Sequence, residues 1–370
     1  MNYLICGGGT GGHVFPALAI ADAIRRDDRV ADILFVGTTR GLEARLVPER
    51  GYRLEFIEFS GFAGKHWWRK LQVIGQLGKA LRHALGLVRM FRPDVVIGVG
   101  GYASLPMVMA AGLLRIPVVL HEQNAFPGLA NRLAAHWASR VCVALPDGVS
   151  GFPLTKAVVT GNPVRRSLFR VRPWRQEPQR LLLFGGSQGA QALNQAMIEA
   201  LPLLRRQFPA LQLLHQTGAA NSEPVRQAYA QAHCGDVEVV PFIEDMAAAY
   251  EASTLVVCRS GATTIAELAA CGRPSLLIPF PLATGDHQTH NARALVAAGA
   301  AVLLPQGQLT GVRLAAEVAQ LLQDPSQLAQ MARQAQTLSA KGAADLIVCL
   351  CRRAIERKRK KTYGALSARG

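Results

Sequence analysis

The chain has 370 residues, of which 50% are hydrophobic, and this suits two folded domains with substantial cores better than one. Lysine and arginine number 41 against 25 aspartate and glutamate residues, so the net charge of +16 favours a polyanionic partner such as a phosphorylated substrate or an anionic membrane surface. Aromatic residues, at 6%, offer little surface for base stacking, which places nucleic acid last among such partners.

Short apolar runs alternate with helical patterns along the chain, which predicts parallel sheets covered by helices on both faces. In the first half we expect strands near residues 2–6, 33–37, 53–57, 94–98, 117–120, 140–143 and 157–160. In the second half we expect them near residues 180–184, 210–215, 237–241, 254–258, 274–279 and 300–304. The polar, proline-containing stretch 161–178 is predicted to be the linker, and a helical segment near 326–357 ends the pattern.

One stretch resembles a membrane span by its length. Residues 95–114 carry no charge and reach the roughly 20 residues that cross a bilayer. Glycines 98, 100 and 101 and Pro106 interrupt this stretch, so we expect a buried strand, a turn and a helix instead. The N-terminus has no basic region before its first apolar run, and the seven cysteines form no CxxC pair. We therefore expect no signal peptide and reduced, cytosolic thiols.

A glycine-rich turn from strand to helix opens each half of the chain. The first lies in residues 3–24 (YLICGGGTGGHVFPALAIADAI) and the second in residues 181–198 (LLLFGGSQGAQALNQAMI). Glycine lets the backbone turn tightly near a ligand, and the free N–H groups of a new helix attract phosphate oxygens. Two such units predict two nucleotide-fold domains facing a cleft, an architecture found more often in enzymes that use sugar nucleotides than in simple binding modules.

The first glycine loop fits the dinucleotide pattern only in part. Gly7, Gly9 and Gly12 satisfy G-x-G-x-x-G, but a dinucleotide site also needs an acidic residue at the end of the second strand to bind a ribose. Gly37 and Thr38 occupy that place, so NAD binding is disfavoured.

Histidine and acidic residues near the predicted strand ends are candidates for chemistry. His13 lies just inside the first helix, where the helix N-terminus disfavours protonation and leaves an imidazole able to accept a proton. A packed or capping histidine is the alternative, and the two interpretations remain open for this residue. His121 and Glu122 follow a buried strand, and strand C-termini are where open α/β sheets bind ligands.

The second half offers a possible ribose contact. Gly261 follows a predicted strand, and Glu267 lies within the next helix, where a carboxylate would accept both ribose hydroxyls unless it is a solvated surface charge. Gln288 and Asn291 are suited to bind sugar hydroxyls, whereas the spacing of His287 and His290 is poor support for a metal site. No Asp-x-Asp pair occurs, so we expect helix dipoles and backbone N–H groups, rather than a metal, to stabilise a leaving diphosphate.

Several motifs occur together in a fixed order: GGGTGGHVFPALA, GVGGYASLP, HEQNAFPGLANR, GNPVR, GGSQGAQALN and CRSGATTIAEL with HQTHNA. In this combination, over nearly its whole length, the chain resembles the MurG family. The family members are UDP-N-acetylglucosamine:undecaprenyl-pyrophosphoryl-muramoyl-pentapeptide N-acetylglucosaminyltransferases of bacterial peptidoglycan synthesis, which serves cell-wall biogenesis, cell shape and cell division.

The resemblance implies an α/β chain with the GT-B fold, two Rossmann-like doubly wound parallel-sheet domains facing a cleft. It implies an N-terminal acceptor and membrane-side domain over residues 1–162, with a C-terminal helix of about 338–357 packing back on it. A domain that binds UDP-N-acetylglucosamine then covers residues 163–337, followed by a basic tail over 358–370.

The implied reaction is an inverting transfer without a metal or other cofactor. The 4-hydroxyl of the lipid-linked muramoyl-pentapeptide attacks the anomeric carbon of UDP-N-acetylglucosamine, UDP leaves, and a β-1,4 link forms, which converts lipid I to lipid II. His13 is the candidate base, and proximity supplies much of the remaining acceleration.

The motifs also assign binding residues. The family's pattern assigns the uracil to the backbone of Ile243, a phosphate to Ser187 and the ribose hydroxyls to Glu267, and brings Gln288 and Asn124 near the N-acetylglucosamine. The remaining donor contacts carried over are Thr10, Gly11, Gly12, Arg165, Ala262, Thr263, Thr264, Ile265 and Ala266. The acceptor diphosphate is assigned to Gly11, Gly12, Gly100, Gly101 and Tyr102.

The chain departs from the common pattern at Leu105, where glycine is frequent, and at Leu282 and Gly285, where histidine and aspartate are frequent. These departures concern the sugar side more than the uridine side.

The lipid acceptor offers a use for the excess positive charge. The segment 59–81 interleaves cations with apolar residues, and paired tryptophans beside cations suit the interface of an anionic bilayer. An amphipathic helix packed on its own domain is the alternative. The expected membrane contacts, at the cytoplasmic face of a bacterial inner membrane to which the protein binds peripherally, are Lys65, Trp67, Trp68, Arg69 and Lys70.

Three other functions fit part of the sequence. A UDP-N-acetylglucosamine 2-epimerase shares the fold and donor but has no need for the segment rich in tryptophan and lysine. A glycosyltransferase that acts on another lipid, such as a diacylglycerol, is a second rival. A non-catalytic module that binds nucleic acid would explain the charge but not the two glycine loops.

Overall fold

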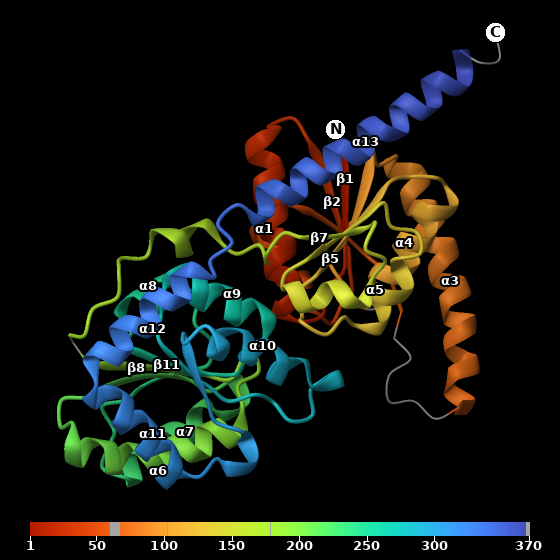
Figure 1. Ribbon diagram of the computed structural model, residues 1–370. Coiled ribbons are helices and arrows are strands. Elements are labelled where there is room, and N and C mark those ends of the chain that lie inside the picture. Colours follow the sequence, from red (N-terminus) through yellow and green to blue (C-terminus); the bar gives the residue numbers. More distant parts are fainter. Residues whose placement is uncertain (60–66, 102, 178, 368–370) are drawn as a thin grey trace. The chain divides into compact units, whose positions relative to one another are not determined.

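The computed structural model describes residues 1–59, 67–101, 103–177 and 179–367, with the backbone alone described for residues 67–74, 284 and 361–367. The chain forms two compact units, shown in Figure 1. The first unit comprises Met1–Val164 and Lys341–Gly370, and the second comprises Arg165–Ala340. The C-terminal segment therefore belongs to the same unit as the N-terminus.

The first unit is built on a parallel sheet with the strand order β3-β2-β1-β4-β5-β6-β7. Its strands are short and mostly apolar on both faces, as expected for a parallel sheet covered by helices. They are β1 (Asn2–Cys6), β2 (Asp32–Gly37), β3 (Arg53–Phe56), β4 (Val95–Gly98), β5 (Val118–Glu122), β6 (Arg140–Val143) and β7 (Ala157–Val159).

Helices cover both faces of this sheet. They are α1 (Gly11–Asp27), α2 (Glu43–Glu49), α3 (Trp67–Phe91), α4 (Ser104–Leu113), α5 (Leu129–Ala134) and α13 (Ala343–Ser367), with a 3-10 turn η1 (Pro146–Gly151). Successive residues of β1 serve opposite faces: Tyr3 and Ile5 join the core cluster of α1 and α13, whereas Leu4 and Cys6 join that of α3 and α4. The period of two along a strand thus separates the two layers.

The C-terminal helix α13 packs against α1 and strands β4, β5 and β6 of the first unit (Figure 1). Its buried residues Ile347, Val348 and Cys351 belong to the same core cluster as Tyr3 and Ile5. The single helical segment expected near 326–357 is wrong, because residues 338–342, which include Ser339 and Gly342, separate α12 (Pro325–Thr337) from α13. Glycine disfavours the interior of a helix, so a break at this place is reasonable.

The sheet of the second unit has six strands in the order β10-β9-β8-β11-β12-β13, which repeats the order of the first six strands of the other sheet, again with parallel pairs. Its strands are β8 (Arg180–Phe184), β9 (Gln212–Gln216), β10 (Glu238–Val240), β11 (Leu255–Cys258), β12 (Ser275–Leu277) and β13 (Ala301–Leu303). Its helices are α6 (Gln191–Gln207), α7 (Ser222–Gln231), α8 (Met246–Ala252), α9 (Ala262–Cys271), α10 (His287–Ala297), α11 (Gly311–Gln323) and α12, with 3-10 turns η2 (Arg166–Arg170), η3 (Ala219–Asn221), η4 (Thr284–Asp286) and η5 (Gln306–Gln308).

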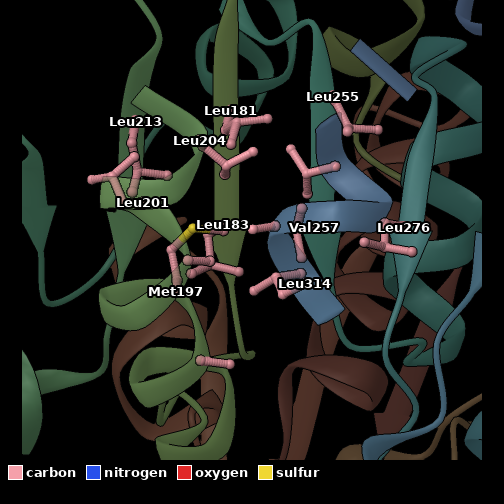
Figure 2. Packing of buried hydrophobic residues seen from close by; sticks show 14 of the residues in the cluster. Leu181, Leu183, Met197, Leu201, Leu204, Leu213, Leu255, Val257, Leu276 and Leu314 are labelled. Atoms are coloured by element: carbon pink, nitrogen blue, oxygen red, sulfur yellow. The ribbon is translucent and has the colours of Figure 1, made fainter. Parts of the chain in front are cut away.

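The core of the second unit joins its central strands to two helices. Figure 2 shows Leu181 and Leu183 of β8 and Val257 of β11 packed among Met197 of α6 and Leu314 of α11. This packing holds β8 and β11 side by side, with Leu183 in register with Val257.

Both sheets reverse their strand order at one point. In the first unit the reversal lies between the adjacent strands β1 and β4, and in the second between β8 and β11. The loops at the carboxyl ends of two such strands diverge to opposite faces, and ligands of doubly wound sheets bind in the crevice between them. Both glycine-rich turns found in the sequence follow one of these strands, β1 or β8.

Within residues 95–114, the described part of the chain forms the strand β4 and the helix α4, as expected, rather than a membrane span. Among the described residues, no helix is both long enough and apolar enough to cross a membrane.

Candidate functional site

In the first unit, the glycine loops that follow β1 and β4 pack backbone against backbone, at the point where the strand order reverses. A β-carbon on Gly7 would lie 2.3 Å from the carbonyl oxygen of Gly100, and one on Gly101 would lie 2.6 Å from that of Gly8. Side chains at these positions would force the loops apart. The clustered glycines after β1 and β4 are therefore required by the close approach of the two loops.

His13 lies where these loops meet. It is the third residue of α1, and its Nδ1 is 3.4 Å from the hydroxyl oxygen of Thr10. On its other side, a β-carbon on Gly100 would be 2.9 Å from Nε2 of His13. Thr10, Gly11, Gly12, His13, Gly100 and Gly101 are thus brought together at one edge of the first unit, whereas Tyr102 lies outside the described residues.

Glu122 shapes the loop that carries Asn124. Its Oε1 accepts hydrogen bonds from the backbone N–H and the side-chain amide of Asn124, at 3.0 and 3.1 Å. Its Oε2 accepts from the N–H of Gly128 and the amide of Asn131, both at 3.0 Å. This buried carboxylate therefore orders the loop after β5. Because both of its oxygens already accept two hydrogen bonds within the protein, it is poorly placed to accept a proton from a substrate.

His121 is a buried, neutral side chain beside that loop. The amide nitrogen of Gln123 lies 3.0 Å from His121 Nδ1 and 2.8 Å from the carbonyl oxygen of Val99. An amide nitrogen only donates, so Nδ1 accepts and the ring proton is on Nε2. Burial, together with a smaller effect of nearby His13, lowers the pKa of His121 to about 4, and the hydrogen bond to the carbonyl oxygen of Gly161 offsets part of that shift. The loops after β4 and β5 are thus joined by an uncharged link.

In the second unit, the loop after β8 presents Ser187 at the surface. Gly186, at φ +96°, and Gly189, at φ +74°, flank it in left-handed conformations. A β-carbon on Gly189 would lie 1.8 Å from the carbonyl oxygen of Thr217, which follows β9. The loop is therefore pressed against its neighbour, and Ser187 remains exposed at the N-terminal side of α6.

The end of β11 is tied to the segment that carries Gln288. The hydroxyl of Ser260 donates to the carbonyl oxygen of Gln288 at 2.8 Å, and the amide of Asn291 donates to the carbonyl oxygen of Ser260 at 3.3 Å. The side-chain oxygen of Gln288 accepts from the N–H of Phe280 at 2.9 Å. Arg259 donates to the carbonyl oxygens of Ile278 and Pro279 at 3.1 and 3.0 Å. The start of α10 is thus positioned by the loop after β11.

Glu267 is a buried carboxylate within α9 and is 5% exposed. Its Oε1 lies 3.2 Å from Nη2 of Arg165, and its Oε2 accepts the hydroxyl of Tyr250 at 3.1 Å. Burial raises the pKa of Glu267 above its ordinary value, and Arg165 and Tyr250 offset part of that rise. A surface charge, the alternative considered for this residue, is wrong.

The other predicted donor residues also lie on this unit. Residues Ala262 to Ala266 form the first half of α9, which Gly261 precedes, and Ile243 lies in the loop after β10. The donor residues Thr10, Gly11, Gly12 and Asn124 belong to the first unit instead. The expected donor set is therefore divided between the two units.

The departures from the family pattern have different surroundings. Leu105 is a buried member of the core cluster that includes α3 and α4. Leu282 is 80% exposed, and Gly285 has φ +65°. Of the expected membrane contacts, Lys65 lies outside the described residues, and Trp67, Trp68, Arg69 and Lys70 open α3 without described side chains.

The sequence analysis missed two residues that hold the predicted site residues in place. Tyr250, in α8, contacts Glu267, and no pattern in the sequence marks it. Glu43, the first residue of α2, is buried against the first glycine loop and accepts the N–H of Gly9 at 2.7 Å. A signal for Glu43 was present, since an acidic residue follows the second strand a few positions after Gly37 and Thr38. In the described part of the chain, no group of three or more His, Cys, Asp or Glu residues is placed to hold a metal ion.

Comparisons with known proteins identify both halves of the chain. Residues 3–143 match the glycosyltransferase family 28 N-terminal domain, and residues 180–347 match the glycosyltransferase family 28 C-terminal domain. The chain is 49% identical to the UDP-N-acetylglucosamine--N-acetylmuramyl-(pentapeptide) pyrophosphoryl-undecaprenol N-acetylglucosamine transferase of Syntrophotalea carbinolica, over 95% of this chain and 98% of the relative. It is 46% identical to the protein of the same name from Syntrophus aciditrophicus, over 95% and 98% of the two chains.

Solved structures of similar fold agree with the family assignment from sequence. MurG from Acinetobacter baumannii is 34% identical, with a TM-score of 0.75 over 95% of this chain and 99% of that one. A putative UDP-N-acetylglucosamine 2-epimerase from Listeria monocytogenes has a TM-score of 0.67 over 94% of each chain, but at 13% identity it shares the fold alone. These matches, with the two parallel sheets, confirm the expected GT-B fold.

Proposed function

Because the chain belongs to the MurG family of glycosyltransferases, we propose how its two units share the family's reaction. The enzyme transfers N-acetylglucosamine from UDP-N-acetylglucosamine to the 4-hydroxyl of undecaprenyl-pyrophosphoryl-muramoyl-pentapeptide. The transfer converts lipid I to lipid II with inversion and forms a β-1,4 link in peptidoglycan synthesis. One observation supports this assignment of a separate role to each unit. In each sheet, a glycine loop follows a strand at the point where the strand order reverses.

The second unit binds the uridine diphosphate in this proposal. Glu267 accepts the ribose hydroxyls through its carboxylate, which Arg165 and Tyr250 hold in one orientation. Ser187 binds a phosphate oxygen, and the backbone of Ile243 binds the uracil. Residues Ala262 to Ala266 line the same region, and Gln288 contacts the N-acetylglucosamine. The hydrogen bond from the hydroxyl of Ser260 to the carbonyl oxygen of Gln288 supports a common site for these residues, because it joins the start of α10 to the loop between β11 and α9.

The first unit binds the acceptor and completes the donor site. Gly11 and Gly12, at the N-terminus of α1, and Gly100 and Gly101 receive the diphosphate of the lipid, together with Tyr102. Thr10, Gly11 and Gly12 also approach the donor, and Asn124 contacts the N-acetylglucosamine. The close packing of the two glycine loops supports a shared phosphate site there.

His13 serves as the base. As the muramoyl oxygen forms its bond to the anomeric carbon, the proton of the 4-hydroxyl passes to the imidazole, and the bond from the anomeric carbon to the UDP oxygen breaks. A position in the first turn of a helix keeps the imidazole neutral and able to accept that proton. The departing diphosphate is stabilised without a metal by backbone N–H groups of the loop after β8 and by the N-termini of α6 and α9.

A direct assay tests the proposal. The protein is incubated with labelled UDP-N-acetylglucosamine and a lipid-linked muramoyl-pentapeptide, with and without EDTA. Label should pass into the lipid fraction equally in both samples, and loss of transfer in EDTA would refute the metal-free step.

A binding test separates the alternative functions. UDP-N-acetylglucosamine, but neither NADH nor DNA, should raise the melting temperature of the protein. Release of UDP with epimerised sugar and no labelled lipid would favour the epimerase alternative.

The protein acts at the cytoplasmic face of the membrane in this proposal, where Lys65, Trp67, Trp68, Arg69 and Lys70 contact anionic lipid. The net charge of +16 and the pairing of tryptophan with cations support it. Sedimentation should be stronger with anionic vesicles than with neutral ones and weaker in high salt. A Trp67→Ala/Trp68→Ala variant that sediments as the parent does would count against these contacts.

A further inference from the structure

Glu43 is a buried carboxylate that joins the ends of β1 and β2 in the first unit. It is 2% exposed. Its Oε1 accepts hydrogen bonds from the N–H and the hydroxyl of Thr38, both at 2.8 Å, and its Oε2 accepts the N–H of Gly9 at 2.7 Å. Hydrogen bonds to a charged acceptor are stronger than bonds between neutral groups, so this carboxylate is a firm attachment point for both loops.

Three glycines make room for this carboxylate. A β-carbon on Gly8 would lie 2.3 Å from Cδ of Glu43, one on Gly37 would lie 2.5 Å from its Cγ, and one on Gly41 would lie 2.0 Å from its Oε2. These glycines are thus explained by a carboxylate of the protein itself. Glu43 thus lies beside Gly37 and Thr38, which occupy the place at the end of β2 where a dinucleotide-binding protein has an acidic residue for a ribose.

Gly9 is held from both sides by the segment that contains Glu43. Its N–H donates to Glu43, and its carbonyl oxygen accepts the N–H of Leu42 at 3.3 Å. Gly7, Gly8 and Gly9 all have positive φ angles, and a glycine chain in such conformations loses much conformational freedom when it is ordered. The bonds from Glu43 and Leu42 offset that cost.

The anchored loop contacts the other elements of the acceptor side. Gly8 lies against Gly101, and Gly100 lies against the ring of His13. We propose that Glu43 is a positioning residue that sets the geometry of both glycine loops and of His13 for the lipid diphosphate. The inference rests on the proposed function, because it assumes that these loops receive the acceptor.

Two variants separate the two contacts of the carboxylate. Glu43→Gln keeps the size of the side chain but removes its charge, and its NH₂ group faces the N–H of either Gly9 or Thr38. One of these bonds is therefore lost and the other is weakened. Thr38→Val removes the hydroxyl bond to Oε1 and leaves the bond from Gly9 to Oε2 in place. Thr38→Val is therefore the matched control. Should Glu43→Gln fail to fold, Glu43→Asp replaces it, because it keeps the charge but withdraws the carboxylate by one methylene.

Hydrogen exchange gives a readout without substrate. Amides of residues 7–12 should exchange roughly tenfold faster in Glu43→Gln than in the parent, as expected for the loss of one charge-assisted bond, and remain near the parent rate in Thr38→Val. The KM for the lipid acceptor should rise about tenfold in Glu43→Gln alone, while the affinity for uridine, whose proposed contacts lie on the second unit, stays unchanged.

Each alternative outcome has a distinct meaning. Unchanged exchange in Glu43→Gln would overturn the positioning role itself. Faster exchange with unchanged acceptor KM and kcat would overturn the link between Glu43 and the acceptor. The proposed function itself would fail only if the parent protein transferred no label to the lipid acceptor. Equal losses in both variants, in proportion to their melting temperatures, would reduce Glu43 to a contributor to stability and overturn the inference.

Discussion

Arg165, the first residue of the second unit, lies with its Nη2 3.2 Å from Oε1 of Glu267 in α9. The side chains are 18% and 7% exposed, so both charges have lost most of their water. A pair of this kind is costly to break, because the remaining charge stays buried without its partner. The pair also aligns the carboxylate that we assign to the ribose.

Arg165→Met should destabilise the second unit by about 3 kcal/mol, the lower end of the cost of breaking a buried ion pair. Adding Glu267→Gln should recover part of that loss, since the double variant no longer buries an unpaired charge. Urea unfolding of the two single variants and the double variant measures this. Arg313→Met is the control, because its partner Glu317 lies one turn along the surface of α11 and such a pair contributes less than about 1 kcal/mol. Additive losses in the double variant would show that Arg165 and Glu267 are not coupled.

Uridine affinity should fall as the pH is lowered, because the Glu267 carboxylate must be ionised to accept two hydroxyls. Burial raises the pKa of Glu267, so protonation begins at a higher pH than for an ordinary glutamate and the affinity weakens correspondingly early. Uridine avoids the titration of the phosphate of UDP, and calorimetry at a series of pH values measures its Kd. Glu267→Gln should bind weakly and show a flat profile. A flat profile in the parent would remove the ribose assignment.

His13→Ala should lower kcat by about a hundredfold or more, the usual contribution of a general base, while UDP affinity is retained. Steady-state transfer with saturating donor and acceptor measures kcat, and calorimetry measures UDP binding. His83→Gln, on the exposed surface of α3, is the control and should keep the parent kcat. Near-normal turnover in His13→Ala would assign the base to another residue.

Gly189→Ala and Gly186→Ala should differ sharply although both glycines have positive φ. At Gly186, no atom lies within 4 Å of the added β-carbon, so the cost is limited to about 1–2 kcal/mol of backbone strain. At Gly189, the β-carbon would meet the carbonyl oxygen of Thr217 at 1.8 Å, so the loop must move. We expect a larger loss of stability and weaker UDP binding in Gly189→Ala, measured by thermal unfolding and calorimetry. Equal effects would show that the contact with Thr217 does not shape the Ser187 loop.

Much of the fold could be predicted from local patterns. The expected strands 2–6, 140–143 and 180–184 agree with β1, β6 and β8, because short apolar runs bounded by polar residues or glycine mark strands buried on both faces. Less regular segments were harder, as the break between α12 and α13 shows. A helical pattern continues through residues 338–342, and the local signal of Ser339 and Gly342 is weak by comparison.

The amino-acid sequence by itself determined two sheets of parallel strands, a glycine loop after the first strand of each, and membership of a family whose motifs span the chain. Only the tertiary structure decided that Glu43 binds the first loop and that Arg165 and Tyr250 hold Glu267. Periodicity and glycine clusters report burial and turning of neighbouring residues. Arg165 and Glu267 are 102 residues apart, and their contact depends on the order in which strands pair and on the helices packed against them.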